Sequence, residues 1–159
     1  MGLLIVFEGC DGAGKTTQRD RAYRFLKQQF PEREIVATRE PGGTELGGQI
    51  RDIVLKTKVS QLAELLLYTA DRVQHLETII KPALRRDAIV LCDRYILSTI
   101  AYQGYGRGLP LDAIAQLNQI IEAPPADLTL WLDMPVELLK DRMKDRTRDR
   151  FDDEAIEFH

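Results

Sequence analysis

The sequence predicts an α/β protein with three layers, in which helices cover both faces of an open parallel sheet. Short apolar runs without polar alternation recur along the chain, and each is too short for a helix. Such runs are typical of parallel strands that are buried on both faces. Segments with helical periodicity separate them, which implies right-handed crossovers between parallel strands. A chain of 159 residues has room for one such domain, which we expect over residues 1–159.

Strands and helices alternate along the chain. The apolar runs that predict strands cover residues 3–7, 35–38, 88–92 and 128–132. The helical patterns cover residues 15–29, 46–56, 61–85, 111–121 and 136–144. We expect the third helix to bend or end at Pro82, because proline lacks the amide hydrogen that a helix interior requires. In such a sheet the functional side chains lie just past the carboxyl ends of the strands.

Composition and charge exclude several classes of protein. The chain is 44% hydrophobic and 30% charged, which does not fit a collagen-like, coiled-coil or wholly disordered protein. A net charge of −3 gives no general attraction to nucleic acid or to an anionic membrane, and no apolar stretch approaches the ~20 residues of a membrane span. We expect neither partner. Cys10 and Cys92 have no metal-ligand spacing, and two cysteines cannot form a disulfide scaffold. This cysteine content suits the reducing cytoplasm.

A phosphate-binding loop follows the first expected strand. Residues 9–16 match G-x-x-x-x-G-K-[ST], and a helix is expected to begin near Lys15. Glycines let successive N–H groups face a polyphosphate, the lysine reaches the outer phosphates, and the Thr16 hydroxyl can hold Mg²⁺. A plain glycine-rich turn is the alternative. The predicted ATP-binding residues are Gly9, Cys10, Asp11, Gly12, Ala13, Gly14, Lys15, Thr16 and Thr17.

Asp93 and Arg94 follow the third expected strand. A carboxylate there is typical of the second group that organises the metal in P-loop proteins, although Asp93 can also simply cap the next helix. Arg94 favours the metal role, because its guanidinium can face the phosphates. We predict that Lys15, Asp93 and Arg94 are catalytic, and that Thr16 and Asp93 hold Mg²⁺, partly through water. The chain has no N-K-x-D motif for guanine, and its one D-x-x-G match lies inside the P-loop.

Several motifs together resemble the thymidylate kinase family. They are Phe7-Glu8-Gly9 with the P-loop, Thr38-Arg39-Glu40-Pro41-Gly42-Gly43-Thr44, Asp93-Arg94-Tyr95, and Ser98 with Ala101-Tyr102-Gln103-Gly104. The resemblance covers about residues 3–151. It implies a nucleoside monophosphate kinase fold and transfer of the γ-phosphoryl group of ATP to dTMP, with Mg²⁺. It also implies a homodimer, and we expect a cytoplasmic enzyme.

The resemblance assigns an acceptor site. Arg39 and Arg51 match positions near the acceptor phosphate, and a planar guanidinium suits that task. Tyr68 and Arg72 share a helix face and match an aromatic ring stacked on thymine and an arginine bonded to a base carbonyl. The expected dTMP-binding residues are Asp11, Arg39, Arg51, Tyr68, Arg72, Ser98, Thr99, Tyr102 and Gln103. The alternatives are a solvated helix face for Arg51 and a core position for Tyr68.

The same resemblance assigns finer roles within this set. Thr99 and Gln103 match groups that bond the thymine edge, Tyr102 matches the residue under the sugar, and Asp11 matches a carboxylate directed at the 3′-hydroxyl. Because the family's turn at this place uses a cis peptide bond, the resemblance also implies one before Pro41. Glu40 is expected to orient an arginine or the nucleotide.

A basic segment reads K-D-R-M-K-D-R-T-R-D-R over residues 140–150. Its first half fits a salt-bridged helix face, and its second half lacks an apolar stripe, which suits a flap. The P-loop has Gly12-Ala13 where some family members place a catalytic arginine. The resemblance therefore implies a lid at about 141–152 that supplies it. The candidates are Arg146, Arg148 and Arg150.

The resemblance also sets expectations about length and rival functions. The family fold has five parallel strands, so we expect a chain truncated at its C-terminus, without the last strand and helix. Other monophosphate kinases stay open, and so do two further functions. A deoxynucleoside kinase would use Glu40 as the base for a sugar hydroxyl, and a nucleotide-binding module would show no turnover. His75 and His159 have no ligand spacing and receive no role.

Overall fold

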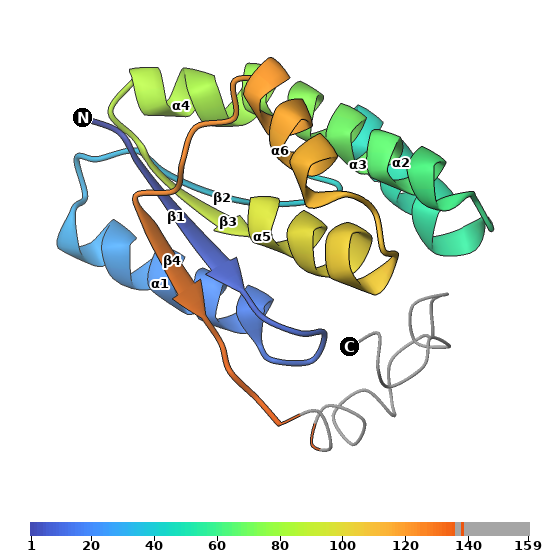
Figure 1. The fold of residues 1–159 in the computed structure, drawn as a ribbon. Coiled ribbons are helices and arrows are strands. Elements are labelled where there is room, and N and C mark those ends of the chain that lie inside the picture. The colour runs from blue at the N-terminus through green and yellow to red at the C-terminus, as the bar shows by residue number, and fades with distance from the viewer. Residues whose placement is uncertain (136–137, 139–159) are drawn as a thin grey trace.

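A four-stranded parallel sheet forms the centre of the molecule (Figure 1). This computed structural model describes residues 1–135 and 138. The strands lie in the order β2–β3–β1–β4. Their bounds are β1 (Leu3–Glu8), β2 (Ile35–Arg39), β3 (Ile89–Asp93) and β4 (Leu128–Trp131). All four predicted strands are confirmed to within one residue at each end, and so is the parallel α/β class.

Helices cover both faces of this sheet. In chain order they are α1 (Lys15–Gln29), α2 (Glu45–Lys56), α3 (Gln61–His75), the π-helix η1 (Leu76–Ile80), α4 (Lys81–Arg85), α5 (Ile96–Thr99), the π-helix η2 (Ile100–Gly106) and α6 (Leu111–Ile120). Apart from residue 138, the expected helix at 136–144 and the lid lie outside the described residues. No helix in the described part of the chain combines the length and the apolar character that a bilayer crossing requires.

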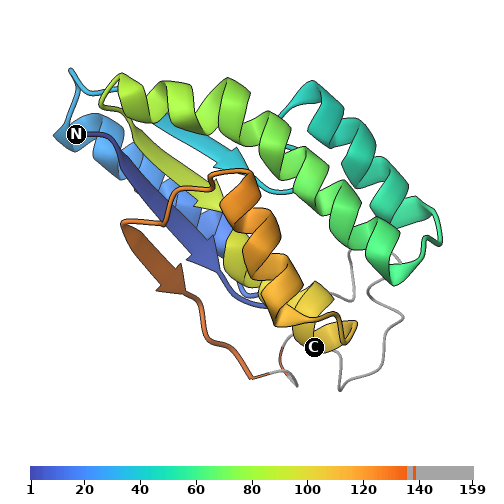
Figure 2. The same cartoon turned by 45° about the horizontal axis from the view of Figure 1, so that its top comes forward.

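The prediction for Pro82 is wrong in part. Figure 2 shows α3, η1 and α4 as one rod above the sheet, and the helical path continues past Pro82 to Arg85. The π-helical segment η1 ends at Ile80, two residues before this proline. Because a π turn changes the hydrogen-bond spacing, the rod tolerates a residue without an amide hydrogen and does not end there.

Two apolar clusters hold the helices on the sheet. On one face Phe7, Ile89 and Leu91 pack against α1, and on the other Val6 and Val90 belong to the cluster that packs on η1 and α4. Residues 89–93 of β3 are all buried, as expected for a central parallel strand covered on both faces.

The strand register brings the functional segments to one edge. Phe7 of β1 lies beside Asp93 of β3, and Asp93 lies beside Arg39 of β2. The carboxyl ends of these three strands therefore meet, and the loops that follow them surround a common space. The expectation of a missing fifth strand stays a prediction.

Candidate active site

The P-loop joins β1 to α1 and is shaped by its glycines. Gly14 is the N-cap of α1 with a φ of 95°, a left-handed conformation that glycine adopts without strain. Gly9 has a φ of 144°, and a Cβ there would lie 2.6 Å from the carbonyl oxygen of Leu132. The loop therefore needs glycine at both positions, and its amides surround the N-terminus of α1, where a helix favours an anion.

Lys15 lies folded over this loop. Its Nζ donates to the carbonyl oxygens of Gly9 at 2.9 Å and Cys10 at 2.7 Å. The side chain is buried, and burial together with the nearby Arg94 guanidinium lowers the pKa of Lys15 to about 8. A phosphate that replaces the two carbonyl contacts would place a negative charge beside the amine and so favour its protonated form.

Thr16 and Asp93 meet at the end of β3, where the Thr16 hydroxyl donates to the Asp93 carboxylate. Both offer oxygen atoms of the kind that Mg²⁺ prefers. Because the pair supplies only two oxygen-bearing side chains, it fits an ion that also takes phosphate oxygens as ligands.

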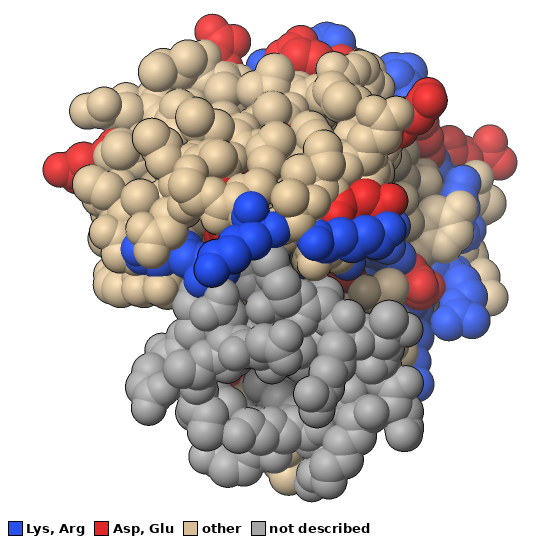
Figure 3. All heavy atoms as spheres, turned by 90° about the vertical axis from the view of Figure 1, so that its right-hand side faces the viewer, with Lys and Arg blue, Asp and Glu red and all other residues tan. Residues whose placement is uncertain are grey.

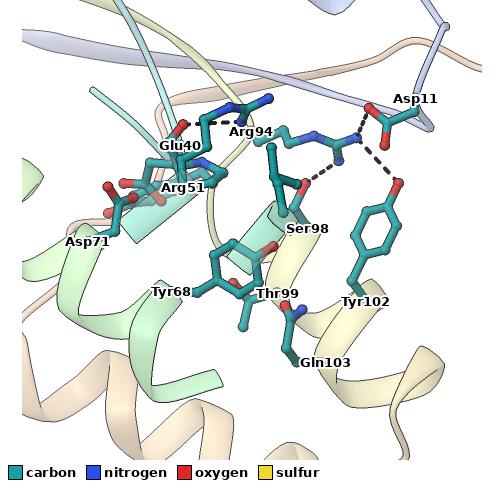
Figure 4. A pocket seen from close by; sticks show the side chains of 13 residues that line it. Asp11, Glu40, Arg51, Tyr68, Asp71, Arg94, Ser98, Thr99, Tyr102 and Gln103 are labelled. Carbon is teal, nitrogen blue, oxygen red and sulfur yellow. Dashed lines mark hydrogen bonds and ion pairs between the residues drawn. The ribbon is translucent and has the colours of Figure 1, made fainter. Parts of the chain in front are cut away.

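Arg94 is held in place from several sides (Figure 4). Its backbone has a φ of 68°, which turns the chain sharply after β3, and its N–H donates to the Phe7 carbonyl. Its guanidinium donates to Ser98 Oγ at 2.9 Å, to Asp11 Oδ1 at 2.9 Å and to the Tyr102 hydroxyl at 3.3 Å. These bonds fix a cation at the mouth of the P-loop.

Glu8 supports this arrangement from behind. It is buried at the end of β1, and its carboxylate accepts the backbone N–H groups of Tyr95 and Ser98 at the start of α5. It also accepts the Ser98 hydroxyl at 2.6 Å. Glu8 therefore fixes the residue that holds Arg94.

A cationic cleft lies beside the P-loop. It is lined by Asp11, Gly12, Gly14, Lys15, Thr16, Thr17, Arg39, Glu40, Arg51, Asp93 and Arg94. Four of these side chains are cations, although the whole chain carries a net charge of −3. Figure 3 shows that Lys and Arg side chains also gather in a band across one end of the molecule. Such a cleft attracts a polyphosphate.

A second pocket opens from this cleft, and the two share four lining residues. Its lining is Asp11, Glu40, Pro41, Arg51, Leu55, Tyr68, Asp71, Arg94, Tyr95, Ser98, Thr99, Tyr102 and Gln103. Figure 4 shows the Tyr68 ring on one side and Tyr102 on the other. Tyr68 is therefore a pocket residue, and the core alternative does not hold.

Arg72 lies behind the wall of this pocket and is not among its lining residues. The side chain is 3% exposed and donates to Glu40 Oε2 at 2.7 Å, Thr99 Oγ1 at 2.9 Å and Asn118 Oδ1 at 3.3 Å. Burial alone would raise the pKa of the Glu40 carboxyl, but Arg72 and His75 lower it below its usual value. Glu40 therefore orients an arginine, as one of its two expected roles requires.

Two residues of this region were not predicted from the sequence. His75 is fully buried, with Nε2 2.6 Å from Thr38 Oγ1 and Nδ1 3.0 Å from Glu40 Oε1. Asp71 lines the pocket and accepts the Gly42 N–H at 3.1 Å, and burial raises the pKa of its carboxyl to about 6. The i, i+3, i+4, i+7 spacing of Tyr68, Asp71, Arg72 and His75 is a signal that would have found both.

The structure brings most of the predicted site together. The predicted acceptor-site residues that line the second pocket are Asp11, Arg51, Tyr68, Ser98, Thr99, Tyr102 and Gln103. Arg39 lines the cleft only, and the cis bond between Glu40 and Pro41 is confirmed. The candidate lid arginines Arg146, Arg148 and Arg150 lie outside the described residues.

Fold and site together define a nucleotide kinase of the P-loop class, because the cationic cleft beside the P-loop opens directly onto a second pocket. The chain belongs to the thymidylate kinase family, whose family model, described as Thymidylate kinase, matches residues 7–159. A thymidylate kinase from Trichodesmium erythraeum (strain IMS101) is 49% identical, with 100% of this chain and 79% of that protein covered. One from Nostoc punctiforme (strain ATCC 29133 / PCC 73102) is 48% identical, with 99% and 77% covered.

A solved structure supports the same assignment. The crystal structure of thymidylate kinase from Ehrlichia chaffeensis superposes with a TM-score of 0.81 and 41% sequence identity. The match covers 91% of this chain and 78% of that one. The fold predicted from alternating strands and helices is therefore confirmed as that of a thymidylate kinase.

Proposed function

We propose that this chain transfers the γ-phosphoryl group of MgATP to dTMP, giving dTDP and ADP. The observation that carries the proposal is the shared boundary of the two cavities. Asp11, Glu40, Arg51 and Arg94 line both the cleft beside the P-loop and the acceptor pocket. Two nucleotides bound in them would meet with their phosphates at this boundary, as in-line transfer requires.

The chemistry at the boundary needs no strong base. A phosphate acceptor is already an anionic nucleophile, so the enzyme has to screen charge and to place the reacting atoms. Lys15 would hold the outer phosphates of ATP. Arg39, Arg51 and Arg94 would neutralise the acceptor phosphate and charge that develops during transfer.

Thr16 and Asp93 would hold the Mg²⁺ ion of the bound ATP, Asp93 in part through water. When bound, the ion screens the negative charge of the phosphates. We expect Asp93→Asn to raise the Mg²⁺ concentration needed for half-maximal rate. An unchanged Mg²⁺ dependence would remove Asp93 from this role.

The transferring phosphoryl group would also need an arginine from outside the P-loop, because Gly12 and Ala13 carry no charge. We infer that Arg146, Arg148 or Arg150 supplies it, which is worth roughly 10³–10⁵ in kcat in related chemistry. Replacing each by alanine, and then all three together, identifies the residue by its loss of kcat. If the triple variant kept the full kcat, the inference would be wrong.

Glu40 argues against the deoxynucleoside kinase alternative. A base for a sugar hydroxyl must accept a proton, whereas the Glu40 carboxylate is bound by Arg72 and His75 and its pKa is lowered. A coupled ADP-release assay with MgATP discriminates the alternatives. We expect turnover with dTMP and none with thymidine. Turnover of thymidine would favour the nucleoside kinase, and nucleotide affinity without product would favour a binding module.

We also infer a homodimer through α2 and α3. Large apolar side chains project from both helices and are between 39% and 57% exposed: Leu46 and Ile53 from α2, and Leu62, Leu66 and Val73 from α3. A surface of this kind favours a protein partner. Light scattering after gel filtration should give twice the mass of the chain. A monomer at micromolar concentration would contradict the inference.

A further inference from the structure

A buried carboxylate lies behind the wall of the acceptor pocket and does not line it. Glu64 of α3 is 1% exposed, and its Oε1 accepts the side-chain N–H of Gln103 at 2.7 Å. The Arg107 guanidinium lies 3.3 Å from Oε1 and 3.4 Å from Oε2. A carboxylate paired with an arginine can only accept hydrogen bonds, so the neighbouring Gln103 must turn its nitrogen toward it.

This hydrogen bond fixes which end of the Gln103 amide faces Glu64. Among the described residues, no fully buried side-chain nitrogen or oxygen lacks a hydrogen-bond partner. The side-chain oxygen of Gln103 has no partner among them, whereas its nitrogen donates to Glu64. The oxygen is therefore not fully buried and opens on the pocket that Gln103 lines. Figure 4 shows the amide end of Gln103 pointing toward Thr99 and Tyr68.

A second buried charged side chain, that of Arg72, fixes the direction of the neighbouring Thr99 hydroxyl. The guanidinium of Arg72 can only donate, and it donates to Thr99 Oγ1 at 2.9 Å. The hydroxyl hydrogen of Thr99 must then point to another partner. Side by side on the pocket wall, Gln103 presents an acceptor and Thr99 presents a donor.

We propose that Glu64 is a positioning residue for base selection, because it fixes the Gln103 amide with its oxygen toward the nucleobase. The proposal rests on the proposed function of this pocket. The acceptor of Gln103 beside the donor of Thr99 would select bases with a ring N–H next to a carbonyl, as in thymine and uracil. Cytosine in the same place would set its N3 lone pair against the Gln103 oxygen and its amine against the Thr99 donor. A mismatch of this kind leaves buried polar groups unpaired.

The test compares the affinities of dTMP and dCMP in Glu64→Gln, measured by calorimetry. The new amide at position 64 can offer either an oxygen or an N–H, so the Gln103 amide loses its single direction. We expect the preference for dTMP over dCMP to fall by about tenfold or more. The matched control is Glu77→Gln, which removes a carboxylate from an exposed ion pair with Lys81. Its preference should stay unchanged, and an unchanged preference in Glu64→Gln would overturn the proposal.

A double variant tests the mechanism rather than the fold. In Glu64→Gln with Gln103→Glu, the new carboxylate at position 103 can only accept, whichever group faces it. The preference for dTMP should recover, and no recovery would overturn the proposal. If neither variant folds, NMR of the unmodified chain decides. The imino proton of bound dTMP should be protected and lie close to the Gln103 amide, and an exchanging imino proton would count against Glu64.

Binding is measured without turnover, so the two proposals fail separately. A chain that binds dTMP selectively but forms no dTDP would contradict the proposed function only. A chain that forms dTDP but keeps its base preference in Glu64→Gln would contradict the role of Glu64 only.

Discussion

Arg94 and Asp11 form an ion pair with 2.9 Å between guanidinium nitrogen and carboxylate oxygen, across 83 positions of sequence. The pair joins the turn after β3 to the P-loop, and both residues line both cavities. The cation that would meet the acceptor phosphate is thus anchored on the loop that binds the triphosphate. The two nucleotide sites are one structural unit at this point.

Replacing Arg94 should therefore damage transfer more than folding. We expect Arg94→Lys to lower kcat by about 100-fold, because an ammonium group cannot hold both Asp11 and Ser98 as the planar guanidinium does. Steady-state kinetics with MgATP and dTMP measure the loss. Arg86→Lys is the control, since Arg86 forms an exposed ion pair with Glu34. A kcat for Arg94→Lys equal to that of the control would contradict this assignment.

The lowered pKa of Lys15 predicts a pH dependence for ATP. Burial, followed by the Arg94 guanidinium, brings this pKa to about 8 in the free chain. The cation that attracts phosphate is present below that pH and is lost above it, so kcat/KM for ATP should fall as pH rises through about 8. Bound phosphates favour the charged amine, so kcat should fall only at higher pH. A flat kcat/KM profile to about pH 10 would show that Lys15 keeps its ordinary pKa.

Two adjacent glycines of α2 should respond differently to alanine. A Cβ at Gly47 would overlap Oδ1 of Asp71 and lie 3.0 Å from Thr44 Oγ1, whereas a Cβ at Gly48 meets nothing within 4 Å. We expect Gly47→Ala to lower the free energy of unfolding by about 1–3 kcal/mol and to weaken dTMP binding, because Asp71 lines the pocket. Gly48→Ala should raise the free energy of unfolding by about 0.5–1 kcal/mol. Equal effects in urea denaturation would argue against close packing at Gly47.

Asp71 should make stability depend on pH. Burial raises the pKa of its carboxyl from 3.8 to about 6, so folding favours the protonated form. This contribution to stability is present below pH 3.8 and is lost as pH rises through about 6. Asp71→Asn keeps an acceptor for the Gly42 N–H and removes the charge. It should raise the free energy of unfolding by about 3 kcal/mol at pH 8 and by about half as much at pH 5.

The control for this measurement is Asp52→Asn, which removes an exposed carboxylate paired with Lys56. Its effect should stay within about 0.5 kcal/mol at either pH. A gain for Asp71→Asn that is the same at both pH values would mean that the carboxyl is not buried as the structure has it.

The fold was predictable because its signals are local. The apolar runs that become β1 and β3 are bounded by charged and glycine residues, and the P-loop marks the start of α1 at Lys15. The path through Pro82 was not predictable, because proline is compatible with a bend, a stop or a π turn. Packing of Leu76 and Ile80 on the sheet decides among them.

The buried network of the site could not be derived in the same way. His75 meets Thr38 and Glu40, which are 37 and 35 positions away. Its helical spacing from Tyr68 and Arg72 predicts a shared helix face, but it does not predict these two partners. Glu64 likewise reaches Gln103 across 39 positions. The residues that touch the pocket belong to motifs, whereas those that hold them in place are found only once α3 is placed against the loops after β2 and β3.

Transfer of label from ATP tests the central claim most directly. With ATP labelled at the γ-phosphate, Mg²⁺ and dTMP, the chain should place the label in dTDP and release one ADP for each dTDP formed. Omission of dTMP should leave the label in ATP. Label that stays in ATP, or that is released as inorganic phosphate whether or not dTMP is present, would contradict the joining of the two cavities at Arg94 and Asp11.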